Sequence, residues 1–223
     1  MLIVHHLNNS RSQRILWLLE ELEVPYQIKF YQRRPDRRAP KEAFDLHPLG
    51  KFPIITDGDV TLAESGAIIQ YIINKYANGR LTPPKQGELI DIYFTHFSEG
   101  SLMPSLTNRY IFSLVPSQAP FFLRPLLKQL FSVLDTKIVA GPLNANLKYV
   151  EDALDRSPTG WFAGGPNPTM ADYMMSFGLD TVATLMPDLL GPKTKAWVAR
   201  VHDRPAFKRV SAYIEGNPRS SKL

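Results

Sequence analysis

Cysteine is absent from the 223 residues. The chain therefore contains no disulfide, no thiolate zinc site and no cysteine nucleophile. Its five histidines show no metal-ligand spacing, because neighbours such as His5 and His6 would point to opposite faces of a strand. No glycine-rich phosphate loop is present either. We expect a protein without a bound metal and without phosphate-loop chemistry.

Long apolar runs are also lacking. None approaches the roughly 18 residues that span a bilayer, and residues 2–7 resemble a strand rather than a basic-then-apolar leader. The 44% hydrophobic and 21% charged fractions are those of an ordinary globular protein. The length fits one large domain or two small ones. We expect no membrane span.

The net charge of +5 is modest. Basic side chains gather between Arg33 and Lys41, beside a proline-containing turn. A nucleic-acid contact is one interpretation of this segment, but it lacks interleaved aromatics and a known motif. The interpretation we favour is a solvated loop that attracts an anionic ligand. We expect no nucleic-acid partner.

The first 79 residues alternate strand and helix patterns. The order is βαβ-α-ββα, and a polar turn at 8–12 separates the first strand from the first helix. The expected elements are strands at 2–7, 26–31, 54–56 and 60–62, helices near 15–22, 41–46 and 65–76, and a hairpin turn at 57–59. This order is the thioredoxin-like α/β arrangement, which predicts one domain over residues 1–79.

Strand signals stop after a linker at residues 80–87. Helical patterns follow at 88–113 (bent at Pro104), 121–139, 143–154, 192–202 and 206–215. Thr169, with Asp172 three residues later, has the spacing of a capping box that starts a further helix. We therefore expect an all-α domain over residues 88–215 and a polar tail at 216–223.

The segment from His47 to Ile68 contains more sequence signals for structure and ligand binding than any other part of the chain. Pro53 at the start of an apolar strand marks an edge or a special turn, and a cis Phe52–Pro53 bond would turn the Phe52 backbone outward to pair with an extended peptide. Ser65 is a good N-cap, and its helix start suits a carboxylate. The carboxylate of Glu64 suits an ammonium group.

Gly50–Pro53 and Glu64–Ile68 together resemble the glutathione-binding half of a glutathione transferase. The resemblance extends along nearly the whole chain and includes the helix start at Thr169–Asp172. It implies a thioredoxin-like domain followed by an all-helical domain, a homodimer, and glutathione as co-substrate with no cofactor. The absence of cysteine excludes the branches that work through a mixed disulfide.

The same resemblance places the thiol contact just after the first strand. Such an enzyme must lower the thiol pKa from about 8.5 by about two units, which takes roughly 2.7 kcal/mol. Counting back from Arg14, Ser10 falls where the serine of theta- and delta-like transferases lies. With the longer loop of some plant classes, Asn9 takes that position. Alternatively, Ser10 only caps the first helix.

Resemblance also assigns the glutathione contacts. Lys51 would meet the glycyl end and the Phe52 backbone the cysteinyl unit, while Glu64 and Ser65 would hold the γ-glutamyl amine and carboxylate. Phe52 is larger than the usual aliphatic residue before the proline. Two assignments complete the set: Pro53 shapes the site, and Lys41 or Arg38 adds a carboxylate contact.

The electrophile pocket is implied less sharply. Met103, Tyr110 and Phe112 lie on the long helix that should face the thiol, although such residues are more often core than ligand wall. A pocket made of them would favour flat apolar electrophiles. The resemblance implies conjugation to such compounds or reduction of organic hydroperoxides.

Ser221-Lys222-Leu223 matches the type-1 peroxisomal address read by an import receptor. An accidental match, with a cytoplasmic protein, is the alternative. The segment from His5 to Glu21 resembles bacterial and fungal transferases more than animal detoxifying classes. We therefore expect a peroxisomal enzyme of the serine type in a fungal or bacterial branch of the family.

Two other functions remain open from the sequence. One is a ligand-binding protein that keeps the fold and the glutathione cradle without useful turnover, which an Asn9-type site would suit. The other is a basic interaction module that uses residues 33–41. Salt-dependent binding to an acidic partner would favour the second.

Overall fold

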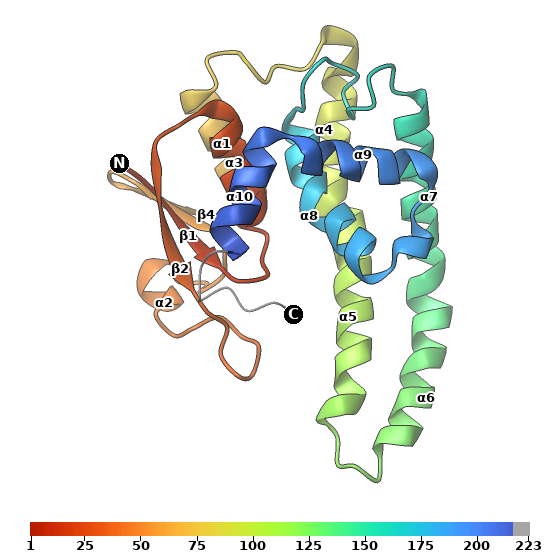
Figure 1. Cartoon of the computed structure of the whole chain (residues 1–223). Helices are drawn as coiled ribbons and strands as arrows, with labels where there is room; N and C mark the ends of the chain where they lie inside the picture. Colours follow the sequence, from red (N-terminus) through yellow and green to blue (C-terminus); the bar gives the residue numbers. More distant parts are fainter. Residues whose placement is uncertain (216–223) are drawn as a thin grey trace.

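The computed structural model describes residues 1–215, so the expected peroxisomal signal at 221–223 lies outside the described residues. Figure 1 shows a small β-sheet part, built by the first third of the chain, beside a larger all-helical part. Two long helical rods of the second part run side by side and project beyond the sheet (Figure 1).

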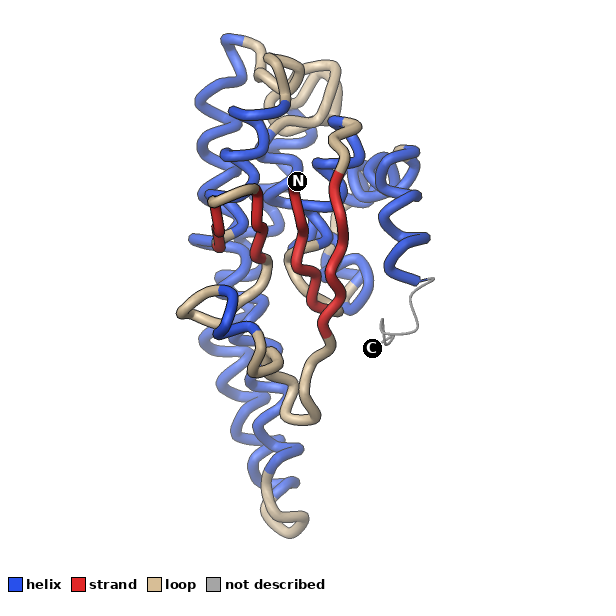
Figure 2. Tube along the Cα trace, turned by 90° about the vertical axis from the view of Figure 1, so that its left-hand side faces the viewer, coloured by secondary structure: helices blue, strands red, loops and turns tan. Residues whose placement is uncertain are grey.

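The predicted βαβ-α-ββα order is confirmed. Its elements are β1 (Leu2–Leu7), α1 (Gln13–Leu22), β2 (Tyr26–Tyr31), α2 (Ala43–Leu46), β3 (Ile54–Asp57), β4 (Val60–Ala63) and α3 (Ser65–Tyr76). The strand order is β2-β1-β3-β4, with β1 parallel to β2 and the other pairs antiparallel (Figure 2). Gly58, with φ +61°, makes the predicted hairpin turn possible.

Helix α1 is buried almost all round, because the sheet part lies on one side of it and helices of the second part on the other. Its run from Ile15 to Leu19 is fully buried, and its Trp17 ring lies 4.5 Å from Tyr173 and 5.9 Å from Phe207. A helix that is buried on nearly every side lies inside a larger core. The two parts of the molecule therefore share one hydrophobic core.

The remainder of the described chain is helical. Its elements are η1 (Lys85–Gly87), α4 (Glu88–Phe97), η2 (Ser98–Leu102), α5 (Met103–Gln118), α6 (Arg124–Leu134), η3 (Asp135–Ala140), α7 (Gly141–Arg156), α8 (Met170–Leu185), η4 (Pro187–Leu189), α9 (Pro192–Asp203) and α10 (Pro205–Glu215). Among residues 1–215, none of these helices has both the length and the apolar character needed to cross a membrane.

Each of the two long rods contains a π-turn directly before a proline. In the first, η2 joins α4 to α5 just before Pro104, where the sequence predicted a bend. In the second, η3 joins α6 to α7 just before Pro142, so the predicted break between two helices at 139–143 is wrong. A proline has no N–H to bond the carbonyl four residues back, and a π-turn absorbs that loss within a continuous helix.

The capping box that starts α8 is present. The Thr169 N–H donates to Asp172 Oδ2 at 2.9 Å. The other oxygen, Asp172 Oδ1, accepts from the Phe162 N–H at 3.2 Å and from Trp197 Nε1 at 2.9 Å. The Thr169 hydroxyl donates to Asp91 of α4. One carboxylate thus joins α8, α9 and the loop before α8.

Candidate functional site

Strand register brings the sequence-predicted segments to one edge of the sheet. His5 of β1 pairs with Ile54 of β3, and Ile54 pairs with Ala63 of β4. Continuing these registers, the chain that leaves β1 after Leu7 runs beside the Phe52–Pro53 bond, and Glu64 follows on the other side. The loop after β1, the proline turn and the start of α3 therefore meet.

The proline turn has the predicted form, since the Phe52–Pro53 bond is cis. Gly50 prepares it: its φ is +56°, and a Cβ there would lie 2.7 Å from the Phe44 ring. Lys51 is exposed and Pro53 is buried. The Phe52 ring packs on Tyr31 of β2, with centroids 5.0 Å apart. The large side chain that the sequence flagged is thus packed against β2.

The start of α3 differs by one residue from the sequence prediction. Glu64 occupies the N-cap position and Ser65 is the first helical residue, so Ser65 does not cap the helix as expected. Glu64 is exposed and has φ 71° and ψ 121°, a conformation that a non-glycine residue adopts only at a cost. Ser65 is buried. The unpaired N–H groups of the first helical turn open at the same edge.

The loop after β1 separates the two candidate thiol contacts. Ser10 is only 7% exposed, and its Oγ lies 2.7 Å from Ser12 Oγ. The Asn9 side chain is exposed, with φ 49° at its backbone. Ser12, not Ser10, occupies the N-cap position of α1. The Ser12 side chain makes no capping bond to α1, whereas Ser10 Oγ accepts from the Ser12 backbone N–H at 3.3 Å, so Ser10 still stabilises the turn that leads into α1.

Part of the basic segment lies against this loop. The Arg33 N–H donates to Asn8 Oδ1 at 2.9 Å, and Arg33 Nη2 donates to the Asn9 carbonyl at 3.0 Å. Arg37 Nη1 donates to the Tyr110 hydroxyl at 2.8 Å, which links the loop to α5. Lys41 is exposed just before α2. Positive charge thus stands beside the Ser10 loop, as an anionic ligand requires.

The three electrophile candidates do not share one surface. Tyr110 faces the basic loop through Arg37, whereas the Phe112 ring packs against Phe131 of α6 with centroids 5.4 Å apart. Met103 is 6% exposed and belongs to the main core. The structure places Tyr110 beside the basic loop and Phe112 between α5 and α6.

Four buried or half-buried residues near the site were not identified from the sequence. Ser12 Oγ lies 2.8 Å from His6 Nδ1 on β1. Arg14 of α1 is fully buried, and its Nη1 donates to Glu99 of η2 at 2.6 Å. Burial lowers the pKa of Arg14 to about 10, against the opposing effect of Glu99. The Ser-x-Ser spacing of the loop was the only sequence signal for any of them.

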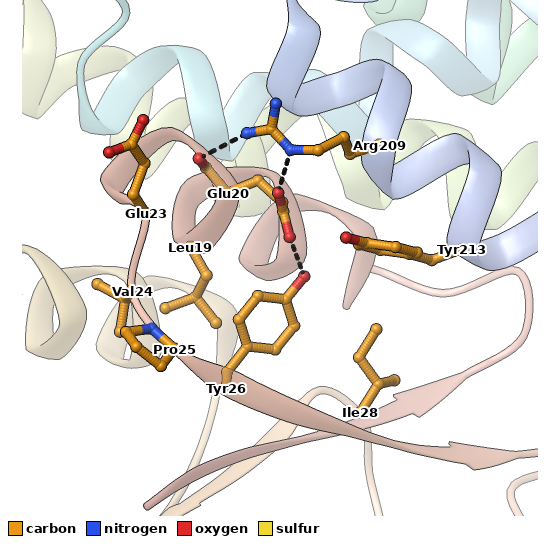
Figure 3. Close-up of a pocket in the computed structure, with 9 residues that line it drawn as sticks. All are labelled: Leu19, Glu20, Glu23, Val24, Pro25, Tyr26, Ile28, Arg209 and Tyr213. Carbon is orange, nitrogen blue, oxygen red and sulfur yellow. Dashed lines mark hydrogen bonds and ion pairs between the residues drawn. The ribbon is translucent and has the colours of Figure 1, made fainter.

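A cavity of about 410 Å³ lies elsewhere, between the end of α1, the start of β2 and α10 (Figure 3). Its polar groups already bond one another: the Tyr26 hydroxyl donates to Glu20 at 2.7 Å, and Arg209 pairs with the same carboxylate. Ser10 is at the opposite end of α1. Among residues 1–215, no three acidic or histidine side chains cluster so as to hold a metal ion.

Comparison with known proteins identifies the family. Residues 1–74 match the family model described as "Glutathione S-transferase, N-terminal domain". Glutathione S-transferase 3 of Schizosaccharomyces pombe is 36% identical over 225 residues, covering 97% of this chain and 89% of that protein. Glutathione S-transferase 1 of Saccharomyces cerevisiae is 32% identical over 185 residues, covering 79% of this chain and 78% of that protein.

Solved structures agree on the fold. A glutathione S-transferase from Actinobacillus pleuropneumoniae superposes with a TM-score of 0.75 at 27% identity, covering 100% of this chain and 97% of that one. The glutathione transferase URE2P8 from Phanerochaete chrysosporium, solved with oxidized glutathione, gives 0.72 at 20% identity, covering 95% and 94%. Sequence relatives, sheet topology and the edge where the proline turn meets α3 all point the same way: the chain belongs to the glutathione S-transferase family.

Proposed function

We propose that the protein is a serine-type glutathione transferase that attaches the glutathione thiolate to apolar electrophiles. The observation that carries the proposal is the meeting of three segments at one sheet edge: the Ser10 loop, the cis Phe52–Pro53 turn and the Glu64–Ser65 helix start. Glutathione is the co-substrate, as throughout the family, and no cofactor is needed. The serine-type, theta-like branch is part of the proposal.

The cradle assigns each end of glutathione to a group of suitable charge. Glu64 receives the γ-glutamyl amine, while Ser65 and the first turn of α3 hold its carboxylate. The outward backbone of Phe52 pairs with the cysteinyl unit, as a strand would. Lys51 meets the glycyl end, and Lys41 adds positive charge beside it. These contacts fix the sulfur next to Ser10.

Ser10 stabilises the thiolate by donating its proton in a hydrogen bond to sulfur. Lowering the thiol pKa by about two units requires roughly 2.7 kcal/mol, and a hydrogen bond to a charged group contributes about 1.5–3 kcal/mol. The start of α1 adds a favourable dipole. The thiol proton leaves to solvent, and the thiolate then attacks an electrophile held near Tyr110 and α5.

The same thiolate can reduce organic hydroperoxides. Sulfur attacks the terminal peroxide oxygen, the O–O bond breaks, and the leaving alkoxide takes a proton to become an alcohol. A second glutathione then displaces hydroxide from the oxidised sulfur and gives glutathione disulfide. Both reactions use glutathione sulfur, so the absence of cysteine in the chain is compatible with either. In each, positioning of the thiolate supplies much of the rate.

The test is the pKa of the bound glutathione thiol, titrated by thiolate absorbance in the wild type and in Ser10→Ala. We expect a wild-type value about two units below 8.5 and a return toward 8.5 in the variant. Asn9→Ala is the matched control and should keep the wild-type value. Turnover of chlorodinitrobenzene and cumene hydroperoxide should fall together in Ser10→Ala.

An unshifted thiol pKa in a protein that still binds glutathione would reject the enzyme and support the non-catalytic binding protein. A depressed pKa that survives Ser10→Ala but not Asn9→Ala would keep the enzyme and move the thiol contact. Binding to nucleic acid or an acidic protein that weakens steeply with salt would instead support the basic interaction module.

We also propose a homodimer and peroxisomal import. Large apolar side chains stay exposed in the helical part, Leu89 of α4 at 74% and Phe121 in the turn between α5 and α6 at 80%, and a partner subunit could cover them. Light scattering on the purified protein measures its mass. A fluorescent fusion with and without Ser221-Lys222-Leu223 distinguishes peroxisomal from cytoplasmic location.

A further inference from the structure

Ser10 is the first member of a buried chain of polar atoms. Its Oγ lies 2.7 Å from Ser12 Oγ, which lies 2.8 Å from His6 Nδ1. The three residues are 7%, 0% and 2% exposed. His6 belongs to β1, and Ser12 is the N-cap residue of α1, so the two inner members of the chain adjoin the sheet and a helix. Its geometry is therefore fixed before any ligand arrives.

The direction of the hydrogen bonds depends on one proton. Each hydroxyl has a single proton and two acceptor sites, and a neutral imidazole has one N–H. If His6 carries its proton on Nδ1, the bonds run from His6 to Ser12 to Ser10. If the proton is on Nε2, they run the other way, and the Ser10 proton is used on Ser12. Only the first direction leaves that proton for sulfur.

A second hydrogen bond to Ser10 Oγ also fits the direction that runs from His6 to Ser12 to Ser10. The Ser12 backbone N–H also donates to Ser10 Oγ, at 3.3 Å. When the Ser12 hydroxyl donates as well, both acceptor sites of Ser10 Oγ are filled. The Ser10 proton is then the only hydrogen-bonding capacity that this oxygen has left, and a ligand atom can accept it.

His6 itself favours the first direction. Its Nε2 is buried and has no hydrogen-bond partner among residues 1–215. A buried N–H without an acceptor is rarer and costlier than a buried lone pair without a donor. Placing the proton on Nδ1 avoids that cost. Burial also lowers the pKa of His6 to about 4, so the ring is neutral at pH 7 and does not accept the thiol proton.

We propose, resting on the function proposed above, that His6 and Ser12 are positioning residues that orient the Ser10 proton toward the glutathione sulfur through the Nδ1–H form of His6. They donate hydrogen bonds and transfer no proton, because the thiol proton leaves to solvent. Ser10 remains the catalytic residue. The polarised chain strengthens its bond to the thiolate beyond that of a lone hydroxyl.

The first test reads the proton on His6 directly in the glutathione-free wild type. NMR of protein with isotope-labelled histidine ring nitrogens distinguishes the protonated nitrogen from the bare one, and loss of one signal pair in His6→Asn assigns it. A proton on Nδ1 at pH 7 is the expected result. A proton on Nε2 would overturn the proposal, whatever the variants do.

The second test measures the bound thiol pKa in four variants. Ser12→Ala and His6→Leu remove a link, and each should raise this pKa by about one unit, less than Ser10→Ala, because the hydroxyl of Ser10 remains. His6→Asn keeps an N–H near the Nδ1 position and should stay near wild type. His5→Leu is the matched control, since His5 is equally buried but contacts Tyr31 and Thr56 instead.

The two proposals fail differently. If the wild-type thiol pKa is depressed and Ser10→Ala restores it, but folded Ser12→Ala and His6→Leu leave it unchanged, the transferase stands and the positioning role falls. If the wild-type thiol pKa equals that of free glutathione, both fall. A shift in His5→Leu equal to that in His6→Leu would also reject the positioning role, because burial alone would explain it.

Discussion

The molecule contains two buried polar clusters that are completed to different degrees. In the helical part, Asp172 accepts three hydrogen bonds, from Thr169, Phe162 and Trp197. In the sheet part, the cluster of Ser10, Ser12 and His6 leaves the Ser10 proton for a ligand in the bond direction proposed above, and His6 Nε2 has no partner among residues 1–215. All the hydrogen bonds of the first cluster stabilise the fold, whereas the second cluster has one donor left for a ligand.

This difference separates stability from chemistry. A saturated cluster contributes to folding because removing its centre strands several buried donors. Removing one member of a cluster that has an unused hydrogen-bond donor should lower the unfolding free energy little but should change how the site binds its ligand. The two clusters should therefore respond in opposite ways to single substitutions, in unfolding free energy and in thiol pKa.

The largest effect is expected from Asp172→Ala. It leaves two backbone N–H groups and the Trp197 ring N–H buried without acceptors, so the unfolding free energy should fall by about 4 kcal/mol. Urea unfolding measures this. The thiol pKa of glutathione bound to the folded fraction should not change. If Asp172→Ala does not fold, Asp172→Asn tests the same separation with a smaller loss.

Ser12→Ala gives the reverse pattern and completes the comparison. It removes one buried hydroxyl, so it should cost only about 1 kcal/mol while raising the bound thiol pKa. If Asp172→Ala shifted the thiol pKa more than Ser12→Ala, the separation of the two clusters would be wrong.

The two clusters should also oppose each other in pH dependence. Burial raises the pKa of Asp172 from 3.8 to about 6, so its contribution is present below pH 4 and is lost as pH rises through 6. Burial lowers the pKa of His6 from 6.5 to about 4, so its contribution is present above pH 6.5 and is lost as pH falls through 4. Each of these two contributions to the unfolding free energy is at most about 3 kcal/mol.

Difference curves between the wild type and each neutral variant isolate these contributions from the other titrating groups. Between pH 4 and 6.5, the unfolding free energy of the wild type minus that of Asp172→Asn should fall as pH rises. The same difference taken with His6→Asn should rise. Two slopes of the same sign would contradict the assignment of either buried group.

A further prediction concerns the ion pair that joins the two parts of the molecule. Glu99→Gln removes the charge that faces the fully buried Arg14, and since Glu99 is itself 36% exposed, we expect a loss of about 2 kcal/mol rather than the 3–5 of a fully buried pair. Asp152→Asn, in the exposed pair with Lys148, is the control and should cost under about 0.5 kcal/mol. Equal losses on thermal unfolding would show that burial of Arg14 does not matter.

Local sequence signals predicted most of the sheet part and the start of α8 in the helical part. The turn at Asp57–Asp59, the cis bond before Pro53 and the capping box at Asp172 depend on residues close in sequence, so the pattern contained them. Contacts between His6 and Ser12, or Arg14 and Glu99, depend on how elements pack, and no local pattern encodes that packing.

The sequence alone could have shown that two of the electrophile candidates face different directions. Tyr110 and Phe112 are two residues apart on a helix, about 200° around its axis, and so cannot face the same ligand. The sequence analysis grouped them because both are aromatic, and so it assigned two different faces of the helix to one pocket. The exact start of α3 was missed for a different reason, because Glu64 adopts a backbone conformation that its residue type disfavours.

The burial of α1 on every side has a consequence for how the protein comes apart. Because Trp17 touches Tyr173 and Phe207, the sheet part cannot lose α1 without opening the helical core, and the reverse also holds. The chain should melt in one cooperative transition, and residues 1–79 cut from the rest would expose the apolar back of α1 to water. Because α1 packs against both parts of the molecule, the sheet part and the helical part should fold and unfold as one unit.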